Sequence, residues 1–162
     1  MEEPVTQVTE SERRRRSALV QEAVDTETRA WDTQDVDLLL GLFHPDMVWP
    51  FPPDSSAHDP LTWVWVNGRF DRERWSADYR ELFAAHRLVH NRRATAGISL
   101  SAQSDAALAV VDVDTLWEHR ATGTRMHWKG RAGKGYSWCH GRWLLVMHTG
   151  LLDYRTAPSE RG

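Results

Sequence analysis

The chain has 162 residues, of which 41% are hydrophobic and 27% are charged, a composition typical of one globular domain with its own core. The formal net charge of −3 favours neither a nucleic-acid partner nor a membrane partner. No apolar run reaches membrane-spanning length, the N-terminus does not resemble a secretory signal, and the single Cys139 provides neither a disulfide framework nor a cysteine zinc site. We therefore expect a cytoplasmic protein.

The first third of the chain predicts two helices and one short strand. Residues 1–10 have the composition of a disordered tail, and apolar residues recur at helical spacing over 11–31. Asp35 is a suitable cap for a second helix, which ends at His44-Pro45 because proline cannot continue the helical hydrogen bonds. A short strand is expected at 47–49, before a proline-rich loop.

The rest of the chain predicts a third helix and then only strands. An extended segment over 61–66 precedes Asp71, which can cap the third helix. Turn residues divide the chain after this helix into four long strands, which we expect near 88–103, 107–119, 125–138 and 142–154. These elements form one domain over 11–155, with a tail over 156–162.

Two carboxylates share one face of the strand expected over 107–119. Successive strand side chains point to opposite faces, so Asp112 and Asp114 lie together with Leu116. Carboxylates on a strand expected in the middle of a sheet need contact with water, a polar or charged partner, or a functional role. Two interpretations stay open: a solvated sheet face, or the floor of a polar pocket in which a carboxylate with a raised pKa acts as acid or base.

The strand expected over 125–138 separates aromatic and small residues from cationic ones. Met126, Trp128, Gly130, Ala132, Lys134 and Tyr136 alternate with Arg125, His127, Lys129 and Arg131. We assign the first set to a cavity, because small residues on a concave face leave room for a ligand. Lys134 would then lie near the pocket, where it either lowers the pKa of a carboxylate or extends outward.

Histidines supply further candidates for acid/base chemistry. His148 is either a hydrogen-bonded core residue or a partner for Asp112 or Asp114, because a His–Asp pair divides the acid and base roles near neutral pH. His58, in the proline-rich loop, either caps that loop or lies at the mouth of the cavity. His90 is a third candidate.

Nine tryptophans are more than an ordinary core of this size needs. The four that we expect to ring a cavity for an aromatic, polycyclic or cationic ligand are Trp49, Trp63, Trp65 and Trp128. The alternative is that these four belong to one dry core. Trp31 and Trp75 are expected to pack between the helices and the sheet.

An apolar outer face of the sheet predicts self-association. The residues expected there are Trp117, Trp143, Leu145 and Met147. Because such a surface is too apolar to remain in water, we expect a homodimer.

Three N-terminal helices, one short strand and then long hairpins resemble the nuclear transport factor 2-like (NTF2-like) superfamily over residues 11–155. The residues that carry the resemblance are Ala30-Trp31-Asp32 with Asp35, Leu42-Phe43-His44-Pro45-Asp46, Met47-Val48-Trp49, and Gly141-Arg142-Trp143 with Met147-His148-Thr149-Gly150. Its members include SnoaL-like polyketide cyclases, ketosteroid isomerase, scytalone dehydratase and limonene epoxide hydrolase. The resemblance implies an α+β fold whose curled antiparallel sheet forms a cone-shaped cavity covered by three N-terminal helices.

The resemblance also implies catalytic residues, which we expect to be Asp114, Asp112 and His148. Asp114 matches the general acid/base aspartate of limonene epoxide hydrolase. That enzyme has an arginine at the place of Asp112 and an aspartate at the place of His148, and its tyrosine and asparagine correspond to Trp49 and Phe51, so epoxide hydrolysis is not expected. The expected substrate-binding residues are Trp49, Phe51, Trp63, Trp65, Leu116, Trp128, Lys134, Tyr136, Val146 and His58.

Two functions remain open on this basis. The first is a SnoaL-like enzyme of natural-product biosynthesis that cyclises, dehydrates or isomerises an apolar, aromatic or polycyclic small molecule without a cofactor. The second is a non-catalytic module of the same fold that binds a ligand or a partner protein. Asp112, Asp114 and His148 would suit iron as a facial triad, but the resemblance argues for metal-free chemistry, so no metal is expected.

Overall fold

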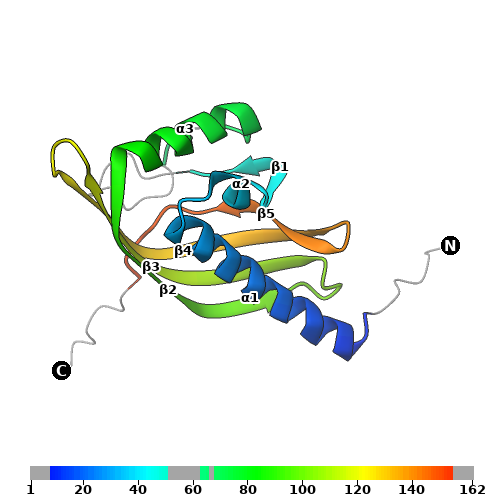
Figure 1. Ribbon diagram of the computed structural model, residues 1–162. Helices are drawn as coiled ribbons and strands as arrows, with labels where there is room; N and C mark the ends of the chain where they lie inside the picture. Colours follow the sequence, from blue (N-terminus) through cyan, green and yellow to red (C-terminus); the bar gives the residue numbers. More distant parts are fainter. Residues whose placement is uncertain (1–7, 51–62, 66–67, 155–162) are drawn as a thin grey trace, which may run out of the picture.

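The computed structural model describes residues 8–50, 63–65 and 68–154 (Figure 1). Within these ranges the helices are α1 (Glu10–Asp32), α2 (Val36–Leu40) and α3 (Arg72–Ala85). The strands are β1 (Phe43–Val48), β2 (His86–Leu100), β3 (Ala106–His119), β4 (Arg125–Cys139) and β5 (Arg142–His148). Across the described part of the chain, no helix combines the length and the apolar character needed to cross a membrane.

Polar caps fix where the helices begin. The Asp35 carboxylate accepts a hydrogen bond from the backbone N–H of Leu38 at 2.9 Å, and Asp71 accepts one from the N–H of Arg74 at 2.7 Å. Each cap satisfies a backbone donor that has no partner within its helix. Both caps predicted from the sequence are therefore confirmed. The predicted end of the second helix at His44-Pro45 is wrong, because α2 ends at Leu40 and the chain is already extended in β1 from Phe43.

The strands form one curled sheet in the order β1-β5-β4-β3-β2. The pairs from β5 to β2 are antiparallel, whereas β1 runs parallel to β5. The curled antiparallel sheet expected from the long strands is confirmed for β2 to β5, and the short β1 adds a parallel strand at its edge. The α+β fold with three helices on one face of the sheet is confirmed (Figure 1).

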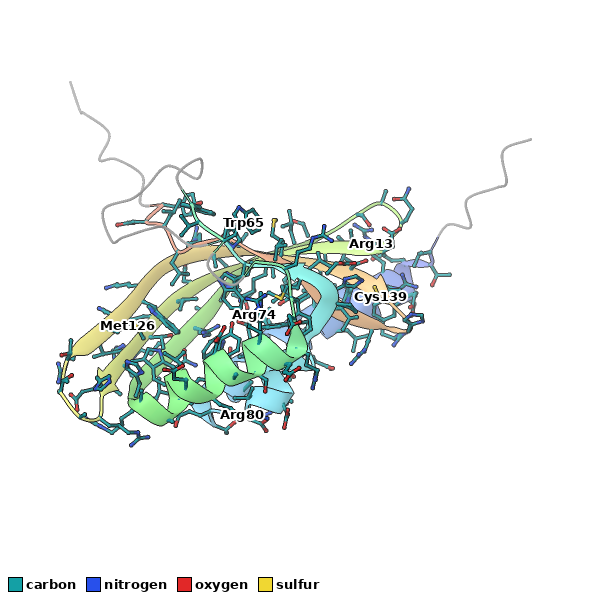
Figure 2. All side chains as sticks on the ribbon, turned by 90° about the horizontal axis from the view of Figure 1, so that it is seen from above. Arg13, Trp65, Arg74, Arg80, Met126 and Cys139 are labelled. Atoms are coloured by element: carbon teal, nitrogen blue, oxygen red, sulfur yellow. The ribbon has the colours of Figure 1, made fainter. Side chains whose placement is uncertain are left out.

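Figure 2 shows α3 lying over the strands, with Met126 and Cys139 marking the two ends of β4. The core lies between the helices and the inner face of the sheet. Its centre is Trp31 of α1, whose ring makes edge contacts with Trp117 of β3 and Trp128 of β4 at centroid distances of 6.4 and 5.6 Å. Trp75 is fully buried and packs on Phe43 of β1. The expected packing of Trp31 and Trp75 between helices and sheet is confirmed.

The last strand is shorter than expected, because β5 ends at His148. The chain rejoins β4 further on, where Arg131 and Leu152 exchange backbone hydrogen bonds of 2.8 and 3.3 Å. Gly130 has a φ of 149°, and a Cβ there would lie 2.9 Å from the carbonyl oxygen of Leu152. The small residue at 130 therefore allows close backbone approach, and the expectation that it leaves room for a ligand is wrong.

The residues predicted for an apolar outer face lie mostly in the core. Trp117, Trp143 and Leu145 are at most 5% exposed, and only Met147, at 39%, is exposed. The predicted position of the first three is wrong, because the helices cover the face of the sheet on which these side chains lie. These three buried side chains cannot form a dimer interface, and the homodimer stays a prediction.

Candidate functional site

Asp112 and Asp114 lie on the outer face of β3, away from the helices. Val111 and Val113, which alternate with them, are buried in the core. Leu116 shares the outer face with the two carboxylates. The expectation that these three side chains line the interior is wrong. The alternation of side chains along a strand determines which residues share a face, and the helices cover the more apolar face of the sheet.

The inner face of β4 carries the set of residues that the sequence assigned to the interior. Ala132, Lys134 and Tyr136 are each at most 3% exposed, and Trp128 packs against the core. Lys134 is the unexpected member, because a lysine is almost never fully buried unless it is paired. Its side chain points towards α1 rather than outward.

A buried carboxylate on α1 meets two cations in this interior. Glu27 is 1% exposed, and its two carboxylate oxygens accept hydrogen bonds from Nζ of Lys134 at 2.8 and 2.7 Å. Arg93 of β2 donates from Nη1 to the same carboxylate at 3.1 Å, and Trp31 donates from Nε1 at 3.3 Å. One carboxylate thus joins α1 to two strands of the sheet.

Burial and charge set the protonation of this pair. Burial alone would raise the pKa of Glu27, but attraction to Lys134 and Arg93 outweighs it and lowers the pKa to about 2. Burial lowers the pKa of Lys134 to about 8, although the neighbouring Glu27 acts in the opposite direction. Glu27 therefore stays ionised, while Lys134 can exchange its proton close to neutral pH.

Two neutral polar side chains flank Lys134. His148 pairs with Lys134 in the register of β4 and β5, and its ring stacks on Trp49 at a centroid distance of 3.9 Å. Tyr136 lies two residues along β4 on the same face. Burial, followed by the charge of Lys134, lowers the pKa of His148 well below its ordinary value, and burial raises the pKa of Tyr136.

Both flanking side chains carry a buried polar atom without a partner. Among the described residues, Nδ1 of His148 and the hydroxyl of Tyr136 have no hydrogen-bond partner. Such atoms are uncommon in folded proteins and call for an explanation. We refer to Glu27, Arg93, Lys134, Tyr136 and His148 as the interior cluster.

The other predicted binding residues are scattered. Trp65 is 53% exposed, so its expected place in a ring around a cavity is wrong, while Trp63 is half-buried with an unpartnered Nε1 among the described residues. Val146 lies at the β-bulge of β5 beside Gly135, which displaces it from the face of His148. Phe51 and His58 lie outside the described residues.

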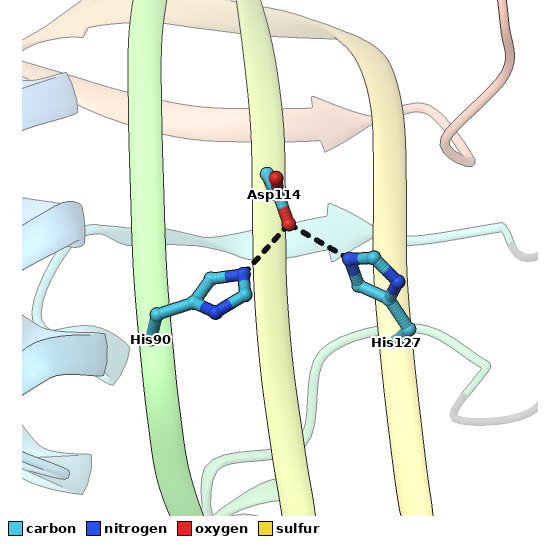
Figure 3. Close-up of side chains that lie close together, drawn as sticks. All are labelled: His90, Asp114 and His127. Carbon is cyan, nitrogen blue, oxygen red and sulfur yellow. Dashed lines mark hydrogen bonds and ion pairs between the residues drawn. The ribbon is translucent and has the colours of Figure 1, made fainter.

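On the outer face, two histidines converge on Asp114 (Figure 3). Nε2 of His127 and Nε2 of His90 each lie 2.7 Å from the same carboxylate oxygen, Oδ1. These hydrogen bonds lower the pKa of Asp114 to about 2. Arg131 donates two hydrogen bonds of 2.6 and 2.8 Å to Asp112 and lowers its pKa as well. Neither carboxylate has the raised pKa expected of a general acid.

Comparisons with known proteins identify the fold. No protein-family model matches the sequence, and no curated protein matches it. A ketosteroid isomerase-like protein from Erwinia carotovora atroseptica matches with a TM-score of 0.63 at 12% identity, covering 85% of this chain and 96% of that one. A conserved protein from Planctomyces limnophilus gives a TM-score of 0.66 at 14% identity, covering 83% and 94%. An NTF2-like protein of unknown function in nutrient uptake from Rhodospirillum rubrum gives 0.59 at 16% identity, covering 82% and 98%.

The chain has the NTF2-like fold. The predicted resemblance is thus confirmed for the fold, and identities this low carry no activity over to this chain. Within this NTF2-like fold, the interior cluster lies between α1 and the inner face of the sheet. It differs from the site predicted from the sequence, which combined His148 with two outer-face carboxylates.

Sequence reasoning missed Glu27, Arg93 and His127. A signal for Glu27 was present, because it follows Ala23 and precedes Trp31 at helical spacing on the buried stripe of α1. A carboxylate in such a stripe needs a buried partner. Arg93 and His127 gave no comparable signal, since their neighbours depend on the register of three strands of the NTF2-like sheet.

Proposed function

We propose that the protein is a small-molecule enzyme that transfers a proton within an apolar, aromatic or polycyclic carbonyl compound, using the interior cluster and no cofactor. The product would be an isomerised, cyclised or dehydrated form of the substrate. The likeness to a ketosteroid isomerase-like protein supports this class of reaction. The aromatic surroundings of the cluster, including Trp49 and Trp31, support an apolar substrate.

Lys134 is the proton acceptor in this proposal. Its neutral amine removes a proton from the carbon next to the substrate carbonyl, which leaves an ammonium group and an enolate. Glu27, already hydrogen-bonded to Nζ, stabilises the ammonium as it forms. The Tyr136 hydroxyl donates a hydrogen bond to the enolate oxygen. Return of the proton from Lys134 to a different carbon completes an isomerisation without consuming any other reagent.

The observation that carries the proposal is a buried Lys134–Glu27 pair beside two buried polar atoms without protein partners among the described residues. An ion pair that only joined α1 to the sheet would need no such neighbours. Each unpartnered atom costs about 1–3 kcal/mol. A substrate oxygen would supply the missing partner for the Tyr136 hydroxyl, and His148 Nδ1 could pair with a second polar group of the ligand.

Hydrogen–deuterium exchange tests proton abstraction before the natural substrate is known. The probe is α-tetralone, a bicyclic aromatic ketone whose protons next to the carbonyl are visible by proton NMR in deuterium oxide. We expect the wild-type protein to accelerate their loss, with a rate that rises with pH as Lys134, whose pKa is about 8, loses its proton. Tyr136→Phe should slow the exchange by about 10²-fold or more, the usual effect of losing one oxyanion donor.

The sequence offers a matched control, because Lys129 and Lys134 are its only lysines. Lys129→Met on the outer face should exchange at the wild-type rate, and Lys134→Met should lose the acceleration. Calorimetric binding of the ketone without any exchange, also with larger polycyclic ketones, would contradict an enzyme and favour the binding module. A Tyr136→Phe variant with full activity would remove Tyr136 from the mechanism.

The cytoplasmic location and the homodimer expected from the sequence also belong to this proposal. Light scattering tests the second point. A monomeric mass would remove the homodimer and leave the proposed reaction in place, because all five residues of the interior cluster come from one chain.

A further inference from the structure

Three potential metal ligands meet on the outer face of the sheet, on the side opposite to the interior cluster. They are His90 of β2, Asp114 of β3 and His127 of β4, one from each of three neighbouring strands (Figure 3). Their ligand atoms all lie within 4.8 Å of one another. Imidazole nitrogens and a carboxylate oxygen are the donors that zinc, cobalt, nickel and iron prefer in proteins.

Strand register brings the three together. His90 and His127 both pair with Leu116, one from each side, and Asp114 is two residues along β3 on the same face. A register shift between Leu88 and His90 places the histidine on this face. Because all three residues lie in paired strands rather than in loops, their positions are held by the backbone of the sheet.

The ligand atoms lie close enough together for one metal ion once the side chains adjust. Both Nε2 atoms lie 2.7 Å from Oδ1 of Asp114. Metal–ligand bonds of about 2.0–2.1 Å require ligand atoms to be about 3 Å apart, so each nitrogen needs to move a few tenths of an ångström away from Oδ1. The two nitrogens lie within 4.8 Å of each other, and rotation of the imidazole rings adjusts their separation. The side chains of His90, Asp114 and His127 are 25%, 29% and 45% exposed, so an ion can enter without unfolding of the sheet.

We propose that His90, Asp114 and His127 bind one divalent transition-metal ion at the end of a groove on the outer side of the sheet, with further coordination positions on the side of Asp114, the ligand that lines the groove. This groove has a volume of ≈ 800 Å³. Its lining includes Arg92, Asp112, Asp114, Lys129, Arg131 and Asp153.

Charge around the groove indicates what would fill the remaining positions. Arg92 and Lys129 pair with Asp114 from the two neighbouring strands and share its face. The described part of the chain provides no ion pair for either cation, whereas Arg131 is occupied by Asp112. Two cations beside a metal ion favour a negatively charged ligand on the metal. The site does not depend on the interior chemistry.

Cobalt(II) binding to the chelator-treated full chain tests the proposal, because the visible absorption of bound cobalt reports its ligands. We expect one cobalt ion per chain. Loss of a residue that merely supports a metal ligand already costs 10–100-fold in affinity, so His90→Ala, His127→Ala and Asp114→Asn should each weaken binding by at least about 100-fold. His140→Asn, which removes an imidazole from a turn where asparagine tolerates the positive φ, is the control and should bind like wild type.

Azide, a small anionic probe, then tests the open positions. Azide should shift the spectrum of the cobalt-loaded protein, and a variant with both Arg92→Met and Lys129→Met should need a higher azide concentration. Far-UV circular dichroism confirms that each variant is folded. Failure of the wild type to bind cobalt stoichiometrically, or equal affinity of His127→Ala and His140→Asn, would overturn the metal site. An unchanged spectrum in azide would show that the bound ion has no open coordination position for an external anion.

Discussion

The two faces of this sheet carry similar sets of charged groups in very different surroundings. On the inner face, Glu27 contacts Lys134 and Arg93, with all three side chains at most 6% exposed. On the outer face, Asp114 contacts two histidines, with side-chain exposures of 25–45%. In each set one carboxylate holds two nitrogen-bearing side chains from neighbouring elements.

Burial decides what each set can do. In the interior, the loss of water strengthens every charge interaction and moves the pKa of Lys134 towards neutrality. On the outer face, water and salt weaken such interactions, and the groups stay accessible to ions. The comparison therefore predicts large energetic effects inside and small ones outside.

The largest effect should come from breaking the interior cluster. Glu27→Gln leaves Lys134 and Arg93 buried side by side without a counter-charge, and removal of one partner of a buried pair typically costs about 3–5 kcal/mol. Urea unfolding measures this loss. The double variant with Lys134→Met as well should recover part of it, and a double variant with strictly additive losses would contradict the coupling.

A smaller interior effect should depend on pH. The folded-state pKa of His148 lies well below its ordinary value of 6.5, so below that pH the unfolded chain binds a proton that the folded chain does not. Stability should therefore fall as the pH drops from about 7 to about 5, by at most about 1.4 kcal/mol per pH unit. Glu27 adds to this pH dependence only below its ordinary pKa of 4.5, because its folded-state pKa is lowered to about 2 and its ionised form stabilises the fold at higher pH.

Urea unfolding at several pH values measures that dependence. His148→Phe keeps an aromatic ring against Trp49 and removes the titrating group, so its stability should change less over the same pH range. If the variant loses stability as steeply as the wild type, the dependence arises elsewhere.

Tyr136→Phe tests the inner face in a second way, because it removes a buried hydroxyl that has no partner among the described residues. Its free energy of unfolding should be unchanged or higher by up to about 1–3 kcal/mol, the cost of burying such a group. Thermal and urea unfolding measure this. A clear loss of stability would mean that the hydroxyl has a structural hydrogen bond.

The smallest effect is expected on the outer face. Arg131→Met breaks the two hydrogen bonds to Asp112, yet both side chains are at least 40% exposed. Such exposed pairs contribute little to stability, and salt screens them. The urea midpoint should stay close to that of the wild type at physiological salt. A change as large as that of Glu27→Gln would contradict the distinction between the two faces.

Local patterns were sufficient to predict most elements of the fold. Helical spacing and the caps Asp35 and Asp71 located the helices, and turn residues located the long strands to within a few residues at most ends. The second helix is one exception, because α2 ends at Leu40 and β1 begins at Phe43, before the predicted end at His44-Pro45. The last strand is another, where a bulge and the approach of Leu152 to Gly130 end the regular pairing early. Such a contact between distant segments leaves no local pattern.

The site could be predicted only in part. Alternation correctly grouped Lys134 with Tyr136 and Asp112 with Asp114, but the side on which the helices pack depends on the whole sheet. The meeting of His90 with His127 depends in addition on a register shift in β2, which sequence periodicity does not contain. The buried Glu27 was visible in the helical pattern and would have indicated a cation in the interior.

The central claim is that Lys134 is buried beside Glu27 and can lose its proton close to neutral pH. NMR titration of the protein with isotope-labelled lysine Cε measures this directly, because only two lysine signals are present and Lys129→Arg assigns them. We predict that the Lys134 signal titrates with a pKa of about 8. A Lys134 signal that titrates at or above the ordinary value of 10.5 would contradict the account.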